Sequence, residues 1–183
     1  MKALLDACVL YPTVMREVLL GVAEAGRFEP LWSPRILEEW ARAAAKLGRG
    51  QETLARGEIA LVEAKFPAAS VTPRAGDMSR LWLPDVHDVH VLAAAIAGSA
   101  DVLVTLNTKD FPRHTLAEEG LIREAPDLFL RDLWAAQPDI VSEVAEHVRR
   151  KAERLSGEAW PIRKLMKKAR LPRLGKALET ADG

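Results

Sequence analysis

The sequence predicts an α/β fold built on a parallel sheet of about five strands, and three observations indicate it. Short apolar runs alternate with stretches in which apolar residues recur at helical spacing. The strongest apolar run, at residues 100–106, is rich in β-branched residues and directly follows a helical pattern. The first run ends in an acidic residue, Asp6, and parallel sheets carry functional groups at the ends of their strands. This alternation predicts βαβ units with helices on both faces of the sheet.

Five segments are expected to form the strands. The first apolar run ends at Asp6 and is too short to form a helix before Pro12, so it is expected to be a buried strand. The segment at residues 69–72 has a weak strand signal. The remaining strands are expected at residues 29–32, 100–106 and 121–123.

Helices are expected between and after these strands, and proline, serine and glycine mark their ends. Pro12 and Pro34 fit the first helical position, and Ser33 before Pro34 is a typical N-cap. Pro67 and Gly98 each end a helical pattern. The expected helices cover residues 12–28, 33–50, 52–66, 85–98, 115–121, 126–136, 138–155 and 160–171.

Charge is distributed unevenly along the 183 residues, although the net charge is zero. Residues 1–146 contain 15 Lys and Arg against 22 Asp and Glu, and residues 147–183 contain 11 against 4. Past Pro138 the pattern becomes helical and basic, without a strand signal. We therefore expect an α/β domain over residues 1–136 and a basic helical extension over residues 137–183. A basic extension keeps nucleic acid a candidate partner despite the neutral total.

The composition also predicts the compartment. A single cysteine, Cys8, excludes a disulfide within the chain, which fits a reducing compartment. Asp6 interrupts the N-terminal apolar run before it reaches the length of a signal peptide core. No segment has the apolar length that a bilayer requires. We expect a cytoplasmic protein without a membrane partner.

Several acids fall where a parallel sheet would bring them to one edge. They end a strand, follow one, or lie in the first turns of a helix: Asp6, Glu38, Glu39, Asp88 and Asp110, with the amide of Asn107 near Asp110 in the sequence. Like charges at short range raise one another's pKa unless a cation joins them. Oxygen ligands select hard cations such as Mg²⁺ or Mn²⁺, and such a site suits phosphodiester hydrolysis.

The stretch at residues 83–91 leaves alternatives open, because it mixes acids with His87 and His90. Zinc requires three or four nitrogen or sulfur ligands, and the other histidines are distant in sequence, so magnesium is preferred over zinc. Asp85 is expected to be an N-cap and Asp88 a metal ligand, although Asp88 also fits a capping arrangement.

Two polar residues near residue 106 also have two interpretations. Thr105 either orients a carboxylate or phosphate, or is an ordinary β-branched strand residue. Asn107 either supports the site or forms an Asx turn.

Four segments resemble the PIN-domain ribonucleases, specifically the VapC-type toxins of bacterial toxin–antitoxin pairs. They are "LLDACVLYP", "SPRILEEWARA", "LPDVHDVHVLAAAIAGSADVLVTLNTKDFP" and "PDLFL", within residues 2–136, and the third is the most specific. The helical extension resembles a C-terminal domain found on a subset of these toxins. The resemblance implies strand order 3-2-1-4-5, Mg²⁺- or Mn²⁺-dependent endoribonuclease activity on an RNA substrate, and a cognate antitoxin. Dimers are common in that family, so a homodimer is also expected.

The resemblance also implies residue roles. Asp6, Asp88 and Asp110 match metal ligands, and Glu39 matches a further catalytic acid, with Glu38 as the rival assignment. In the matching motif Asn107 lies beside Asp110, which the resemblance implies is a supporting position.

Two residues depart from the family pattern. Cys8 stands where Asn is usual, which removes a possible hydrogen bond near the metal. Asn107 stands where many members have Asp, which weakens a second metal position. These departures leave a non-cleaving RNA-binding or scaffold module as the alternative function. A phosphatase with an Asp nucleophile is less favoured, because it would need a second Asp at the position of Cys8.

The basic extension contains candidate RNA contacts. The cations that could neutralise phosphates are Lys164, Lys167, Lys168 and Arg170. A solvated helix face, or a face that docks on the acidic domain, is the competing interpretation.

Overall fold

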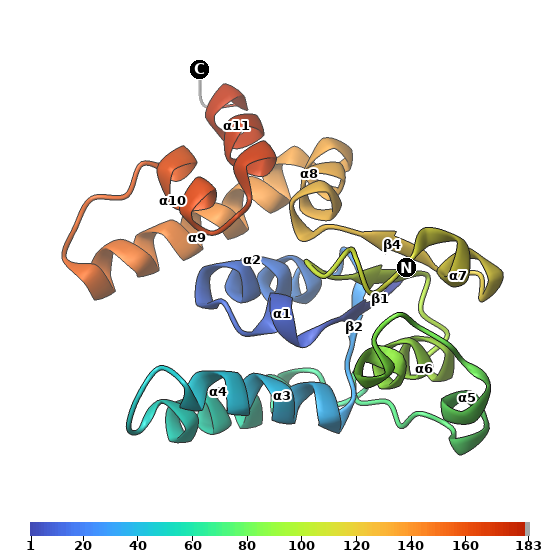
Figure 1. Ribbon diagram of the computed structural model, residues 1–183. Helices are drawn as coiled ribbons and strands as arrows, with labels where there is room; N and C mark the ends of the chain where they lie inside the picture. Colours follow the sequence, from blue (N-terminus) through green and yellow to red (C-terminus); the bar gives the residue numbers. More distant parts are fainter. Residues whose placement is uncertain (182–183) are drawn as a thin grey trace. The chain divides into compact units, whose positions relative to one another are not determined.

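The computed structural model describes residues 1–181, which form two compact units (Figure 1). Unit 1 comprises Met1–Tyr11 and Phe28–Glu124, and unit 2 comprises Pro12–Arg27 and Ala125–Gly183, of which residues 182 and 183 are not described. Within the described residues, no helix is both long enough and apolar enough to cross a membrane.

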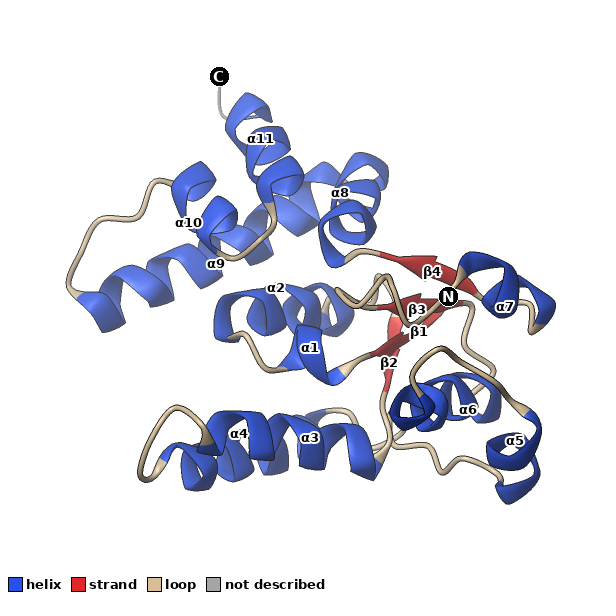
Figure 2. Ribbon diagram, viewed as in Figure 1, coloured by secondary structure: helices blue, strands red, loops and turns tan. Residues whose placement is uncertain are grey.

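A parallel four-stranded sheet forms the centre of unit 1 (Figure 2). Its strands are β1 (Lys2–Leu5), β2 (Glu29–Leu31), β3 (Val102–Val104) and β4 (Ile122–Glu124), in the order β2-β1-β3-β4. The register of the two central strands pairs Leu5 with Val104, so the residues that follow them, Asp6 and Thr105, are neighbours at the carboxyl edge. The predicted α/β class with a parallel sheet is confirmed.

The expected third strand, at residues 69–72, is reduced to one parallel bridge between Ser70 and Trp32, beside the end of β2. Pro67 and Pro73 flank this segment, and proline cannot donate to a strand ladder, so the pairing stays short. If this bridge is counted as a strand, the order is the expected 3-2-1-4-5.

Helices surround the sheet of unit 1. They are α1 (Ala7–Leu10), α3 (Pro34–Ala45), α4 (Gln51–Lys65), α5 (Ala75–Arg80), the 3₁₀ helix η1 (Val86–Asp88), α6 (Val89–Ala97) and α7 (Arg113–Glu118). Helix α3 begins as predicted, because Ser33 Oγ accepts a hydrogen bond from the Ile36 amide. Helix α5 was not predicted, and it buries none of its residues, so it lacks an apolar pattern in the sequence.

Helix α6 determines where the acidic segment just before it, residues 85–88, lies. It packs against β1 and β3 and leads into β3 through the short turn after Gly98. A Cβ at Gly98 would lie 2.7 Å from Leu31 Cδ1, so a larger residue would require the Leu31 side chain to shift. Since α6 runs antiparallel to the strand that follows it, its first turn and η1 lie at the carboxyl edge of the sheet.

Unit 2 is helical and consists of α2 (Thr13–Glu24), α8 (Pro126–Ala136), α9 (Pro138–Ser156), α10 (Ile162–Lys168) and α11 (Pro172–Ala181). Helix α2 packs on α9, where Lys151 Nζ lies 2.6 Å from Glu17 Oε1. The Asp127 carboxylate of α8 accepts hydrogen bonds from the amides of Arg173 and Leu174 at the start of α11. The expected division at residues 136–137 remains a prediction; it falls between α8 and α9, which pack together within this unit.

Candidate metal centre

Asp6 is the most enclosed acid at the carboxyl edge of the sheet. Its side chain is 8% exposed, and its Oδ2 accepts a 2.6 Å hydrogen bond from Thr105 Oγ1. Thr105 is fully buried, and its hydroxyl oxygen in turn accepts from the amide of Asn107. The hydroxyl therefore orients the Asp6 carboxylate, which agrees with the orienting role considered for Thr105.

Cys8 adds a second hydrogen bond to Asp6. Its thiol donates to Asp6 Oδ2 at 3.1 Å, and its sulfur accepts from the amide of Leu106 at 3.2 Å. Burial, followed by the negative charge of Asp6, raises the pKa of the thiol to about 12. Cys8 therefore stays protonated and remains a donor at neutral pH. The expectation that cysteine removes a hydrogen bond at this position is wrong, because a protonated thiol donates to the carboxylate.

Three carboxylates come close together, and Asp6, which was also expected to be a metal ligand, is not among them. One oxygen from each of Asp85, Asp88 and Asp110 lies within 4.8 Å of the others. Asp85 also caps η1, where it accepts a 2.8 Å hydrogen bond from the amide of His87. Asp85 was expected to be a cap in preference to a ligand, so its place in this acidic cluster is an addition.

Asn107 connects this acidic cluster with Asp6. Its Nδ2 donates a 2.9 Å hydrogen bond to Asp88 Oδ2, and its amide donates to Thr105 Oγ1. A continuous chain of hydrogen bonds thus runs from Asp88 through Asn107 and Thr105 to Asp6. Asn107 therefore has a supporting position in the site.

Asp88 is the acid whose ionisation the site disfavours most clearly. Burial is the largest cause, and the negative charges of neighbouring acids add to it, so its pKa is raised to about 6. The neighbours that contribute are Asp6, Asp85, Asp110 and Glu39. All four acids assigned to catalysis from the sequence are therefore electrostatically coupled at one place in unit 1.

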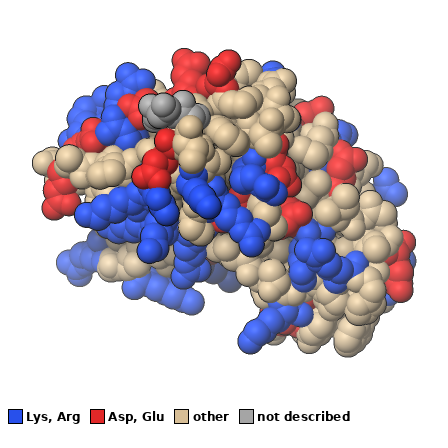
Figure 3. Space-filling view, turned by 90° about the horizontal axis from the view of Figure 1, so that it is seen from above, with Lys and Arg blue, Asp and Glu red and all other residues tan. Residues whose placement is uncertain are grey.

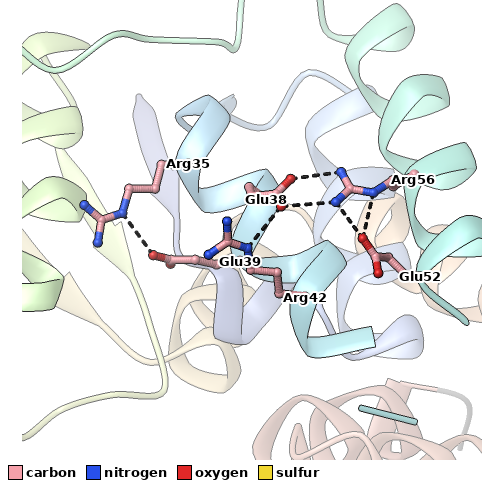
Figure 4. A network of polar contacts seen from close by, with 6 residues as sticks. All are labelled: Arg35, Glu38, Glu39, Arg42, Glu52 and Arg56. Carbon is pink, nitrogen blue, oxygen red and sulfur yellow. Dashed lines mark hydrogen bonds and ion pairs between the residues drawn. The ribbon is translucent and has the colours of Figure 1, made fainter. Parts of the chain in front are cut away.

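Glu38 and Glu39 point in different directions from α3 (Figure 4). Glu38 pairs with Arg42 and with Arg56 of α4, at 3.1 and 2.9 Å, and these hydrogen bonds lower its pKa to about 2. The ion pair between Glu38 and Arg56 joins α3 to α4.

Glu39 lies on the side of α3 that faces the acidic cluster. Its Oε1 is 2.8 Å from Nε2 of the buried His90 and 3.4 Å from Arg35. Burial acts to raise the pKa of Glu39, but His90 and Arg35 outweigh it and hold the pKa below its usual value. Of the two rivals, Glu39 is the acid whose negative charge contributes to the raised pKa of Asp88.

The donor set fits a hard cation. The acidic cluster offers carboxylate oxygens only, and Cys8 is protonated and turned to Asp6. Uncompensated carboxylates at this separation repel one another, which is the cause of the raised pKa of Asp88 beyond its burial. Mg²⁺ and Mn²⁺ prefer such oxygen ligands, so the acidic cluster can hold one of these ions.

A family model described as PIN domain (PIN_3) matches residues 2–109, more than half of the chain. The chain belongs to the PIN-domain family. PIN domains are typically metal-dependent nucleases, and the matched region contains Asp6, Glu39 and Asp88, with Asp110 one residue beyond its end. No curated protein and no solved structure matches the chain significantly.

Sequence reasoning missed three contributors to this PIN-domain site. Asp85 had a signal, because it lies three residues before Asp88 and a helical turn puts such residues on one side. The contact of His90 with Glu39 and the bridge from Cys8 join segments far apart in sequence, so no local pattern predicts them.

The four cations proposed for RNA belong to α10 and the turn after it, in unit 2.

Proposed function

We propose that this PIN-domain protein is a metal-dependent endoribonuclease of the VapC type, the toxin of a toxin–antitoxin pair. The observation that carries the proposal is the close approach of Asp85, Asp88 and Asp110, whose oxygens lie within 4.8 Å of one another. Such a group is costly without a cation and is typical of a site that works with one. A bound Mg²⁺ or Mn²⁺ supplies Lewis acidity, which lowers the pKa of an attacking water and offsets charge on a phosphate.

Each residue of the proposed metal centre has a role that follows from its position. Asp85, Asp88 and Asp110 present oxygens for the cation, and Asn107 fixes the Asp88 carboxylate through its 2.9 Å hydrogen bond. Asp6, oriented by Thr105, is the ligand nearest the sheet. Preorganised donors of this kind reduce the rearrangement that binding would otherwise require.

Glu39 completes the proposed set of catalytic acids. His90 and Arg35 keep it ionised, so it stands ready beside Asp88 to accept a proton from an attacking water. Attack by water on the phosphorus of an RNA phosphodiester, with departure of the 3′ oxygen, leaves a 5′-phosphate and a 3′-hydroxyl.

The toxin role rests on the motifs within residues 2–136 that resemble VapC-type proteins. A cognate antitoxin and a homodimer are part of this proposal. Expression of the chain alone should then arrest growth, and co-expression of the protein from an adjacent reading frame should relieve the arrest.

The experiment that tests the activity is cleavage of total RNA by the purified chain. We expect cleavage with Mn²⁺ or Mg²⁺, none with EDTA, and 5′-phosphate ends in the mapped products. Asp88→Asn should abolish cleavage, whereas Asp132→Asn, on an exposed face of α8, should not. Full activity of Asp88→Asn, or cleavage in EDTA, would reject the proposal.

A non-cleaving RNA-binding module is the second candidate, and Asn107 is the observation in its favour. Its amide donates to Asp88 where a further carboxylate would strengthen a second metal position. RNA binding with no metal-dependent cleavage would assign the chain to this class.

A further inference from the structure

Unit 2 contains a stretch of unbalanced positive charge. From Trp160 to Lys176 the sequence has seven Lys and Arg residues and no Asp or Glu. Arg163 pairs with Glu179 at 2.6 Å. The other six cations of this stretch are exposed and form no ion pair among residues 1–181. Four of them lie on α10 or in the turn after it, and we call these the α10 cations: Lys164, Lys167, Lys168 and Arg170. Figure 3 shows blue side chains gathered over the region of α9 and α10.

Trp160 brings two of these charges together. The Nζ atoms of Lys164 and Lys168 lie 5.6 and 4.6 Å from the centre of its ring. The indole is itself held, because its Nε1 donates to Ser156 Oγ and its backbone amide donates to Glu153 Oε1. Two ammonium groups are thus fixed near one rigid ring. Like charges one helical turn apart repel each other. A polyanion that neutralises both ammonium groups should therefore bind favourably beside the Trp160 ring.

An apolar groove of about 440 Å³ adjoins the α10 cations. Its lining includes Val14, Leu155, Trp160, Leu165 and Lys168, all within unit 2. Leu155 is 75% exposed, so the groove presents an apolar side chain to solvent. Lys168 contributes both to the groove and to the α10 cations, so an apolar surface and unpaired cations meet at one residue.

We propose that the α10 cations and this groove bind single-stranded RNA, with phosphates on the cations and an unstacked base against the groove. The inference rests on the proposed function only in taking RNA as the ligand. Aromatic and apolar surfaces bordered by cations are typical of sites for single strands, whose bases are free to leave the stack. An acidic protein segment is the competing occupant. The cations alone suit either polyanion, but the apolar groove beside them can take an unstacked base, which an acidic segment lacks, so we favour RNA.

The test measures binding in EDTA, where the proposed cleavage cannot occur. A fluorescent oligouridylate of about 20 nucleotides is titrated with the full chain at several KCl concentrations. For the triple variant Lys164→Ala, Lys167→Ala and Lys168→Ala we expect Kd to rise at least about ten-fold. The slope of log K against log salt should become shallower by about 2, because three phosphate contacts are lost at about 0.7 each.

A matched control removes the same charge elsewhere. Lys46, Arg49 and Arg74 are exposed cations of unit 1, and their triple change to alanine should alter Kd less than about two-fold. An equal loss in the control, or an unchanged Kd and salt slope in the α10 variant, overturns the inference. So does loss of affinity for a polyglutamate peptide without loss for RNA, which would assign the surface to an acidic protein.

The outcome is independent of the proposed activity. A chain that never cleaves RNA but needs the α10 cations to bind it supports this inference and rejects the nuclease. A chain that cleaves with Mn²⁺ but binds RNA equally well without the α10 cations does the reverse.

Discussion

Thr105 Oγ1 donates a 2.6 Å hydrogen bond to Asp6 Oδ2, across the carboxyl ends of two adjacent strands. The pairing of Leu5 with Val104 puts these two residues side by side, and the fully buried hydroxyl also accepts from the amide of Asn107. One side chain thus connects the β1 acid with the segment that fixes Asp88.

Replacing Thr105 with valine should therefore weaken the metal centre. The variant keeps the shape of the side chain but removes the donor to Asp6 and the acceptor for Asn107, so Mn²⁺ affinity should fall about ten-fold. The free energy of unfolding should fall by about 1–3 kcal/mol, because buried polar groups lose their partners. Calorimetric titration with Mn²⁺ and urea unfolding measure the two effects. Thr105→Ser, which retains the hydroxyl, is the control and should stay near the wild type.

The Cys8 thiol should resist alkylation in the folded chain. With its pKa raised from 9.0 to about 12, its thiolate fraction at pH 8 is about 1,000-fold smaller than that of an ordinary thiol. Iodoacetamide labelling followed by mass spectrometry, in EDTA, should be slow in buffer and fast in denaturant. Equal rates in the two conditions would contradict a hydrogen-bonded, protonated Cys8 thiol.

Glu38 and Glu39 should differ sharply when each is changed to glutamine. Glu39→Gln removes the charge beside Asp88 and should lower kcat/KM for RNA cleavage by at least about ten-fold. Glu38→Gln affects the pairs with Arg42 and Arg56 and should leave the rate within about two-fold. A larger loss from Glu38→Gln than from Glu39→Gln would reverse the assignment.

The metal-free chain should lose stability as pH rises from about 4 to about 6. In this window folded Asp88, with its pKa raised from 3.8 to about 6, holds a proton that the unfolded chain releases. The stabilising protonated form is fully present below the unfolded pKa and is lost above the folded one. Because Asp88 is only partly buried, solvent screening reduces the effect to about 1 kcal/mol.

Asp88→Asn isolates this contribution. In EDTA at pH 8 the variant should be more stable than the wild type by about 1 kcal/mol, and the difference should disappear near pH 4. Urea unfolding across this pH range makes the comparison. Added Mn²⁺ should stabilise the wild type but not the variant, since only a bound ligand stabilises the folded state. A difference that does not change with pH would show that Asp88 is not the titrating group.

Local patterns predicted most of the fold of unit 1. Alternating apolar runs and helical spacing were sufficient for the sheet, and the Ser33 cap and Pro34 marked the start of α3. Helix α5 was missed because it buries no residues. The grouping of α2 with α9 depends on Val144 packing against Gly21, where a Cβ would come within 2.6 Å, and no local signal reports such a contact.

Topology accounts for the positions of several residues that were expected in the site. Asp6 and the residues after β3 meet because parallel strands end at the same edge, and Asp88 lies at the start of the helix before β3. The resemblance favoured Glu39 over Glu38, but the partners that distinguish the two acids, Arg56 and His90, come from other helices, so no local pattern reports them. The capping role expected for Asp85 is confirmed, but a cap and a member of an acidic cluster have the same sequence signature.

Mn²⁺ binding to the purified chain, followed by calorimetry or electron paramagnetic resonance, tests the central claim most directly. The claim is that Asp85, Asp88 and Asp110 form a metal centre. We predict saturable binding to the wild type and to Asp132→Asn, and a loss of at least about ten-fold in affinity for Asp88→Asn. Equal affinities of the wild type and Asp88→Asn, or no binding to either, would contradict it.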